Sequence, residues 1–306
     1  DYRTFSSSFI NRSDKWLYSE KNFMNPKIIP PRPSPIQKNF SLILISVFVF
    51  WSFSIGDGSF LDLFYAKNLD QIKTYISKFW PIDLQRSFLS LTVFAALETL
   101  AISIAGTVIS IFIAIFTLYT STSTKVLNTG GEWETSYHKD NLLQASALFM
   151  TKAILNFFRT IPEIIWAVIF VFATGLGPFA GVLAIGVHNA GVLGKLFSET
   201  IENVKLQPIE SIRASGSKKS LAFLYAALPQ AFPQLIAYCL YRWEVNIRTA
   251  AILGLVGAGG LGKQVHIAIS LFLESRVATL TLAIFFLVNC VDFLSSWIRK
   301  KLDVNL

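Results

Sequence analysis

Long, uninterrupted apolar runs constrain this chain more than any other feature of its 306 residues. The run from Ile102 to Tyr119, for example, carries no charged residue and only scattered Ser, Thr and Gly. A helix on a soluble protein pairs an apolar stripe with a polar face, whereas a helix that is apolar on all sides is stable in lipid. Because 53% of the residues are hydrophobic, the chain is predicted to be an all-α, polytopic transmembrane helical bundle.

Six membrane spans are predicted from these runs and from the turn residues between them. Proline suits the first turn of a helix, so the third span is predicted to begin at Pro162. Pro229 and Pro233 lie within the fifth span and predict a kink there. Residues 142–158 are predicted to form an amphipathic helix leading along or into the membrane, at a depth that the sequence leaves open. The approximate bounds of the six spans are 40–55, 94–119, 162–174, 179–197, 228–256 and 277–298.

The basic residues indicate which side of the membrane the two ends occupy. Lys and Arg outnumber Asp and Glu by 27 to 19, a formal net charge of +8, which alone would also fit a nucleic-acid-binding protein. These residues gather beside the first and last apolar runs, at Lys27, Arg32 and Lys38 and at 299–301. Since Lys and Arg accumulate in cytoplasmic loops, both termini are predicted to be cytoplasmic, with membrane lipid as a partner and no nucleic acid.

Composition divides the chain into four regions. The first is polar and proline-rich, which is typical of a flexible arm, and the second includes an amphipathic segment around Trp80. Cys239 and Cys290 both lie in apolar runs, so they are predicted to be packed thiols and not a disulfide. The four regions are 1–38 (flexible cytoplasmic N-terminal arm), 39–85 (first span and external amphipathic segment), 86–301 (membrane core, with a charged cytoplasmic loop at 198–220) and 302–306 (C-terminal tail).

The charged loop before the fifth span carries the most informative motif. Glu210 is followed six residues later by Gly216, and Leu228 and Pro229 lie twelve and thirteen residues beyond that glycine. A short helix that is broken at Gly216 lets a second helix turn away, so the loop would present a compact knob to a partner protein. An ordinary amphipathic loop at the membrane surface is the alternative interpretation.

This spacing resembles the EAA loop of binding-protein-dependent ABC importer permeases, whose pattern is Glu-Ala-Ala, three residues, Gly, nine residues and Ile-x-Leu-Pro. Here Ser211 and Ile212 replace the two alanines and Ala226 replaces the isoleucine, while the spacing is kept. The resemblance implies that the loop docks on an ATPase subunit. The residues assigned to this coupling loop are Glu210, Ser211, Ala214, Gly216, Leu228 and Pro229.

Four further segments are similar to the phosphonate importer permease branch of that family: 159–163, 177–183, 188–196 and 241–248. With the loop and the glycine-rich segment described next, the resemblance covers about residues 90–300. It implies a type I ABC importer permease-like fold in a bacterial inner (plasma) membrane, a second copy of the chain, two copies of a cytoplasmic ABC ATPase and a periplasmic substrate-binding protein. It also implies alternating-access import of phosphonate or a related small phosphorus oxyanion such as phosphite. The chain itself would then be no enzyme and hold no cofactor, because ATP and Mg²⁺ belong to the partner ATPase.

The glycine-rich segment 257–264 matches the residue pattern of nucleotide-binding motifs but not their structural context. It fits G-x-G-x-x-G, and Lys263 fits the lysine of a P-loop, but Gln264 stands where a P-loop has a Ser or Thr. Those motifs also need a preceding strand in a soluble fold, whereas this segment follows a membrane span. We interpret it as a tight bend or a close helix approach near the translocation path. Its glycines are Gly257, Gly259, Gly260 and Gly262.

Polar side chains inside the spans are candidates for the translocation path, because each is costly in lipid unless it is paired or hydrated. Glu244 and Arg248 are four residues apart with the acid first, so a structural ion pair explains them equally well. Arg242 cannot share a helix face with Glu244 and needs another partner. For His188 and Asn189, hydrogen bonding between helices is the alternative. The candidates are Arg242, Glu244, Arg248, His188, Asn189 and Glu98.

Other classes of protein fit the sequence less well. The three histidines, His138, His188 and His266, have no second His or Cys at the spacing of metal ligands, so no metal site is predicted. A secondary transporter or channel that uses the intramembrane ionisable residues is the alternative function. Such a protein would work without an ATPase and usually carries an internal repeat, which the sequence does not show.

Overall fold

The computed structural model describes residues 35–54, 66–122 and 139–303. The chain divides into two compact units, Asp1–Lys73 and Thr74–Leu306. Most of the predicted N-terminal arm, most of the predicted C-terminal tail and His138 lie outside the described residues. The described part of the first unit is helical, and the second unit contains the predicted membrane core.

The first unit holds helix α2 (Pro35–Ser54), and α3 (Ala66–Ser77) crosses the boundary into the second. Helix α2 begins five residues before the predicted first span, so the end of the predicted arm is helical. Its strongly apolar stretch, Asn39–Ser52, is shorter than the roughly 20 residues that a straight crossing needs. Helix α3 lies where an amphipathic segment was predicted, and it alternates polar residues with Leu69, Ile72 and Ile76.

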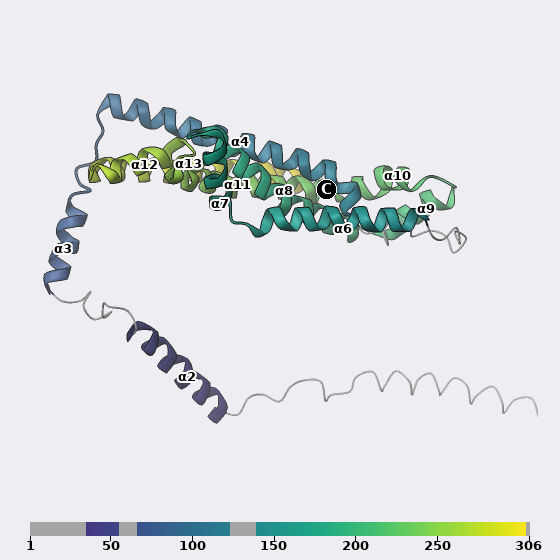
Figure 1. Ribbon diagram of the computed structural model, residues 1–306, viewed down its shortest axis with the longest axis horizontal. Helices are drawn as coiled ribbons and strands as arrows, with labels where there is room; N and C mark the ends of the chain where they lie inside the picture. Colours follow the sequence, from purple (N-terminus) through teal and green to yellow (C-terminus); the bar gives the residue numbers. More distant parts are fainter. Residues whose placement is uncertain (1–34, 55–65, 123–138, 304–306) are drawn as a thin grey trace, which may run out of the picture. The chain divides into compact units, whose positions relative to one another are not determined.

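The second unit is a bundle of helices whose described residues contain no strand (Figure 1). Helices α9 and α10 lie at one end of the bundle, which we call the α9 end, and α12 lies at the other (Figure 1). The helices of this unit are α4 (Arg86–Ser121), α6 (Lys139–Thr160), α7 (Glu163–Thr174), α8 (Pro178–Glu202), α9 (Leu206–Ala214), α10 (Lys219–Ala222), α11 (Leu228–Leu253), α12 (Gly260–Ser270) and α13 (Glu274–Asp303).

Within the described residues, four helical stretches are long and apolar enough to cross a membrane. They are α4, α8, the continuous run Lys219–Val256 that contains α11, and Glu274–Lys301 in α13. A fifth crossing is possible if α6 and α7, which are bent by 91° at their junction, form one broken span. The predicted count of six is therefore not confirmed, because two predicted spans are too short. These are the apolar stretch of α2, Asn39–Ser52, and α7, which has 12 residues and is about 18 Å long.

The break between α6 and α7 follows from the local sequence. Pro162 is the N-cap of α7 and not its first helical residue, a small correction to the predicted start. A proline disfavours helical geometry at the residue before it, so Ile161 ends the preceding helix. The break exposes backbone carbonyls, and the indole nitrogen of Trp166 donates to the carbonyl of Phe158 at 3.1 Å. Side chains thus satisfy carbonyls at the break.

Helix α8 is the centre of the bundle, because α4, α6, α7 and α11 all pack against it. Its glycines and alanines let neighbouring backbones approach closely. A Cβ added at Gly191 would lie 2.4 Å from the carbonyl oxygen of Leu155, on α6. A Cβ at Gly186 would lie 2.9 Å from a methyl group of Ile109, on α4. Larger residues at these positions would force the helices apart.

The glycine-rich segment connects α11 to α12 through a sharp bend. Gly257, Gly259 and Gly260 have φ angles of 96°, 83° and 68°, which side chains with a Cβ rarely adopt. The backbone N–H of Leu261 donates to Thr99 Oγ1 at 2.8 Å, and this bond fixes the start of α12 against α4. Gly262 is helical, and its Cα faces the carbonyl of Ala251 so closely that a Cβ would fall 2.0 Å from that oxygen. The segment is both a bend and a close helix approach.

At the α12 end, Asp83 ties the start of α4 to the start of α13. The Gln85 backbone N–H donates to Asp83 Oδ1 at 3.0 Å, and Arg276 Nε lies 3.1 Å from Oδ2. These contacts, the Gln85 hydrogen bond first, hold the pKa of Asp83 below its ordinary value of 3.8. Thr279 also donates to the Asp83 carbonyl at 2.9 Å. The Asp83 carboxylate is therefore ionised near neutral pH and keeps its contacts with Gln85 and Arg276.

Replacement of Gly191 by alanine is expected to destabilise the bundle more than replacement of Gly194. A Cβ at Gly191 meets the backbone of α6, which cannot move without shifting the helix, whereas one at Gly194 meets the side-chain tip of Leu155. We expect Gly191→Ala to cost about 1–3 kcal/mol, partly offset by the better helix propensity of alanine. Thermal unfolding of the detergent-solubilised variants measures the difference, and equal midpoints would contradict this packing.

Candidate coupling loop and buried polar network

The coupling loop is a short helix, a tight turn and a second short helix. Helix α9 ends at Ala214, and Gly216 follows with a φ of 81° and donates its N–H to the carbonyl of Arg213 at 2.9 Å. The Arg213 guanidinium reaches across the turn to the carbonyl of Ser217 at 2.8 Å. No described atom outside its chain neighbours comes within 4 Å of a Cβ built at Gly216. The glycine is therefore needed for backbone geometry and not for space.

The loop projects from the α9 end but is rooted in the core (Figure 1). Glu210, Ser211 and Ala214 are exposed. Ile209 is only 2% exposed and joins a cluster that includes Leu193 and other buried residues of α8. The exposed face of α9 is thus free to contact a partner, while its buried Ile209 belongs to an apolar cluster to which α8 also contributes.

The matching Leu228–Pro229 pair lies at the junction between the loop and α11. The helix widens just before it into a π-helical turn, Phe223–Ala227, in which the Leu228 N–H bonds to the Phe223 carbonyl five residues back. Pro229 has no N–H to donate, so the chain enters α11 through this wider turn. Leu228 packs against the same apolar cluster as Ile209. The two parts of the motif, the loop at 210–216 and the Leu228–Pro229 pair, therefore adjoin the same apolar cluster.

A chain of hydrogen bonds crosses three helices in the middle of the bundle. Arg242 on α11 donates through Nε and Nη2 to Asn189 Oδ1 on α8, the Nε contact being 2.7 Å. Asn189 Nδ2 donates to Asn246 Oδ1 at 2.8 Å, and Asn246 Nδ2 donates to Thr107 Oγ1 on α4 at 2.8 Å. Thr107 in turn donates to the Ser103 carbonyl at 2.6 Å. Every member donates in the same direction, which favours a strong cooperative network.

A carboxylate–histidine pair lies next to this network, at the start of α7. His188 Nδ1 is 2.9 Å from the Ile161 carbonyl oxygen, which can only accept, so Nδ1 carries a hydrogen. His188 Nε2 is 3.2 Å from Glu163 Oε1, and Arg242 Nη2 is 3.8 Å from the same oxygen. His188 therefore bridges the carbonyl of Ile161 and the carboxylate of Glu163, beside the Arg242 guanidinium.

Glu244 and Arg248 belong to a separate network that joins α11 to α13. Their predicted ion pair is present at 3.5 Å, but shorter contacts run to the other helix. Arg299 Nη2 lies 2.9 Å from Glu244 Oε2, and Arg248 Nη2 lies 2.6 Å from Asp292 Oδ2. The structure therefore gives these two candidates a structural role between helices.

The predicted site residues fall into four places and not into one. His188, Asn189 and Arg242 come together in the central network, and the predicted need of Arg242 for another partner is met by Asn189 and Glu163. The loop residues lie at the α9 end, and the Glu244 and Arg248 network lies against α13. Glu98 is half-buried near the glycine bend, where a Cβ at Gly259 would fall 2.8 Å from its Oε1.

Sequence reasoning missed three members of the central network: Glu163, Asn246 and Thr107. Asn246 could have been found, because it lies four residues after Arg242 and two amide or charged groups at this spacing share one helix face. Glu163 follows the helix-breaking proline and was quoted only as part of a motif. Thr107 gave no signal, because every Ser and Thr of an apolar helix can bond its own backbone.

Comparison with known proteins identifies the family. Residues 149–304, about half of the chain, match the model of the binding-protein-dependent transport system inner membrane components. The matched region contains the coupling loop and the central network except for its α4 members. The chain belongs to this family and is a membrane-spanning permease component of an ABC importer.

Individual relatives are phosphite and phosphonate system permeases. The chain is 35% identical over 204 residues to the phosphite transport system permease protein PtxC of Stutzerimonas stutzeri, covering 67% of this chain and 68% of that protein. It is 32% identical over 231 residues to the putative phosphite transport system permease protein HtxC of the same organism, covering 76% of each. It is 45% identical over 118 residues to the putative cryptic phosphonate transport system permease protein PhnE2 of Escherichia coli K12, covering 39% of this chain and 97% of that protein.

A solved structure supports the fold independently. A chain of the MetNI methionine ABC transporter, in inward-facing conformations, superposes with a TM-score of 0.59 at 21% sequence identity. The match covers 72% of this chain and 99% of that one. At this level of identity the likeness establishes the helical permease fold, which was the fold expected from the sequence.

Replacement of Asn246 by leucine tests whether the central network stabilises the bundle. Asn246 is fully buried, and the change leaves the amide of Asn189 and the hydroxyl of Thr107 without their shared partner. We expect a loss of about 1–3 kcal/mol, seen as a lower midpoint of thermal unfolding in detergent. Asn289→Leu is the matched control, because Asn289 is exposed and bonds only the Phe285 carbonyl of its own helix. Equal midpoints for the two variants would refute the structural importance of the network.

Proposed function

We propose that this permease imports phosphonate or a related small phosphorus oxyanion, such as phosphite, across the bacterial inner membrane. The observation that carries the proposal is the similarity to permeases of phosphite and phosphonate transport systems over as much as three quarters of the chain. Phosphite and phosphonate share one chemistry, a tetrahedral phosphorus that carries charged oxygens. The substrate class is therefore the chemistry that these relatives have in common.

The interior of the bundle suits such an anion. A small oxyanion that leaves water needs hydrogen-bond donors or cations along its route. Arg242 presents its guanidinium among α7, α8 and α11, with its side chain 13% exposed. Its main contact is the neutral amide oxygen of Asn189, so its charge is only partly compensated. A passing anion would meet a positive potential here without displacing a buried carboxylate from a tight ion pair.

The working assembly, in this proposal, is a homodimer of the permease with two ATPase subunits and a periplasmic substrate-binding protein. The ATPases dock on the two α9–α10 loops, so in this proposal the α9 end faces the cytoplasm, where both chain termini are also proposed to lie. ATP and Mg²⁺ bind to the ATPases, which carry out the hydrolysis. The exposed face of α9 and the buried Ile209 support this role, because a push on one face reaches the core through the other.

The motion proposed is alternating access. When the ATPases close, the loops move together, and the displacement enters α8 and α11 through the cluster around Ile209. The central helices then change which side of the membrane the path opens to. Family membership favours this ATP-driven cycle over the secondary-transporter alternative, which would rely on the intramembrane ionisable residues alone.

Two substitutions at Gly216 separate the coupling geometry from simple bulk. The φ of 81° is accessible to asparagine but not to a β-branched residue. We expect Gly216→Val to abolish ATP-dependent uptake of labelled phosphite and methylphosphonate in proteoliposomes that contain the permease, its ATPase and its binding protein. Gly216→Asn should keep most of the uptake, because it preserves the turn.

The outcomes distinguish the loop from the substrate. Normal uptake by Gly216→Val would refute the coupling role of the loop. Uptake that persists in the absence of the ATPase or ATP would favour the secondary transporter. No uptake of either compound, with ATP hydrolysis intact, would reject the substrate class while leaving the importer assignment in place.

A further inference from the structure

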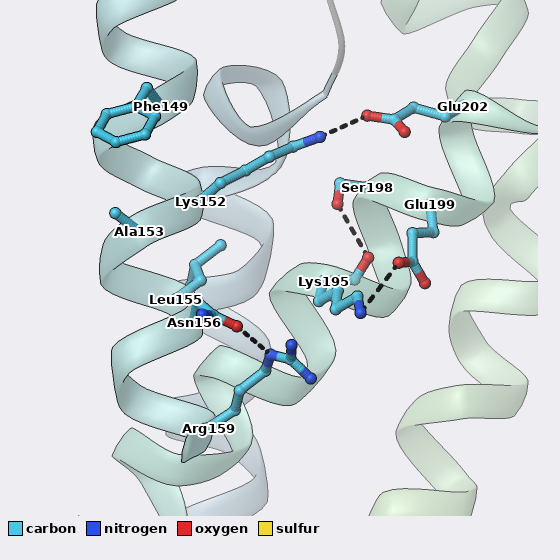
Figure 2. Close-up of a pocket in the computed structure, with 10 residues that line it drawn as sticks. All are labelled: Phe149, Lys152, Ala153, Leu155, Asn156, Arg159, Lys195, Ser198, Glu199 and Glu202. Atoms are coloured by element: carbon cyan, nitrogen blue, oxygen red, sulfur yellow. Dashed lines mark hydrogen bonds and ion pairs between the residues drawn. The ribbon is translucent and has the colours of Figure 1, made fainter. Parts of the chain in front are cut away.

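A cavity of about 480 Å³ is lined by residues of α6 and α8, which Figure 2 shows. This volume is in the range of sites that bind small organic ligands. None of the candidate residues from the sequence lines it. The cavity is therefore separate from both the coupling loop and the central network.

Three cations and two carboxylates line this cavity. Lys152 and Arg159 come from α6 and Lys195 comes from α8, while Glu199 and Glu202 also come from α8. The lining therefore carries one net positive charge when all five groups are ionised. In a bundle within lipid, such an uncompensated charge is costly unless an anion or water accompanies it. The excess of cations favours an anionic occupant.

The two lysines are already engaged, and Arg159 is the cation left for a ligand. Lys152 Nζ lies 3.0 Å from Glu202 Oε1, and Lys195 Nζ lies 3.4 Å from Glu199 Oε1. Arg159 donates only its Nε, to Asn156 Oδ1 at 2.9 Å. Its two terminal nitrogens contact no acceptor among the described residues.

The geometry of Arg159 suits an oxyanion. Asn156 holds the guanidinium through Nε, and Figure 2 shows the group turned toward the α8 side of the cavity, below Lys195. The two terminal nitrogens form a fork that matches two oxygens of a phosphorus oxyanion. Lys195 can donate to such an anion while it stays paired with Glu199, because an ammonium group has three N–H donors. The ion pairs with Glu202 and Glu199 hold Lys152 and Lys195 in place.

The remaining lining indicates what is attached to the anion. Phe149, Ala153 and Leu155 give the α6 side an apolar character, and Ser198 adds a hydroxyl on α8. A bare inorganic anion would fill little of 480 Å³, given that water occupies about 30 Å³ per molecule. An organic group bonded to the phosphorus, directly or through oxygen, would cover the apolar surface.

We propose that this cavity binds the phosphorus oxyanion of an organic phosphonate or phosphate, with the Arg159 fork as its anchor and Lys195 as a supporting cation. The same head-group chemistry has two sources, a free phosphonate on its way to the cytoplasm and an anionic phospholipid. The free source rests on the proposed function, whereas the binding site itself does not.

The test uses the full-length chain in nanodiscs, without ATPase or binding protein. In the first arm the lipid is phosphatidylcholine, and binding of radiolabelled methylphosphonate is measured by equilibrium dialysis. In the second arm the discs also contain phosphatidylglycerol, and native mass spectrometry counts the phosphatidylglycerol retained after release into detergent. We expect Arg159→Gln to weaken binding about tenfold in at least one arm. Arg86→Gln, at the exposed start of α4 and the α12 end of the bundle, is the matched control and should change neither.

A variant that is expected to bind the anion more tightly serves as a control for misfolding. Glu199→Gln frees Lys195 from its carboxylate and adds one positive charge to the lining, so it should tighten binding severalfold. A misfolded protein would not bind more tightly. Weaker binding by Glu199→Gln, or binding in both arms that is indifferent to Arg159→Gln, would overturn the proposal.

The two arms and the uptake assay distinguish the possible failures. Dependence on Arg159 in the methylphosphonate arm assigns the free anion as the ligand, and dependence only in the phosphatidylglycerol arm assigns the lipid. Normal ATP-dependent uptake together with no Arg159-dependent binding rejects this site alone. Arg159-dependent binding together with uptake that needs no ATPase rejects the proposed function alone.

Discussion

Lipid offers no hydrogen-bond partner, and this constraint shapes every polar feature inside the bundle. The hydroxyls along α4 bond carbonyls three or four residues back, as Thr99 does with Ala95 at 2.9 Å. At the break between α6 and α7, the carbonyls of Phe158 and Ile161 accept hydrogen bonds from Trp166 and His188. Where a group cannot be satisfied within its own helix, another helix supplies the partner, and the position of that helix is thereby fixed. The chain of bonds from Arg242 to Thr107 sets α11, α8 and α4 in register in this way.

Helix α8 connects the two functional regions because it contributes to both. Asn189 lies in the central network, and Leu193, one turn further along the same helix, lies in the cluster that holds Ile209 of α9. The small residues of α8 bring the backbones of α4 and α6 against it, so a displacement of α8 has to move its neighbours or slide between them. A force on the coupling loop therefore meets a closely packed helix and reaches the centre of the membrane core within a few turns.

The sequence predicted what depends on neighbouring residues and missed what depends on how helices are arranged. Apolar runs gave the helical membrane fold, and the spacing of Glu244 and Arg248 gave their ion pair. The stronger contacts of that pair, with Asp292 and Arg299, depend on the register of α11 against α13, which no local pattern contains. The count of six spans was not confirmed because the apolar stretch of α2 and α7 are each too short to cross alone, and α7 also bends away from α6. Hydropathy reflects the composition of a segment and does not indicate how the helix is oriented in the bundle.

Three cations of α6 and α11, Lys152, Arg159 and Arg242, each have at least one internal partner. Lys152 has Glu202, Arg159 has the amide of Asn156, and Arg242 has the amide of Asn189 with Glu163 beyond it. A path for an anion needs sites that attract it enough to enter and release it readily enough to leave. An isolated arginine in lipid would bind an oxyanion too tightly to release it, whereas one that returns to an internal amide exchanges one partner for another. In the proposed anion path, the neutral and acidic partners would therefore matter as much as the cations, because they would set how weakly each cation holds its anion.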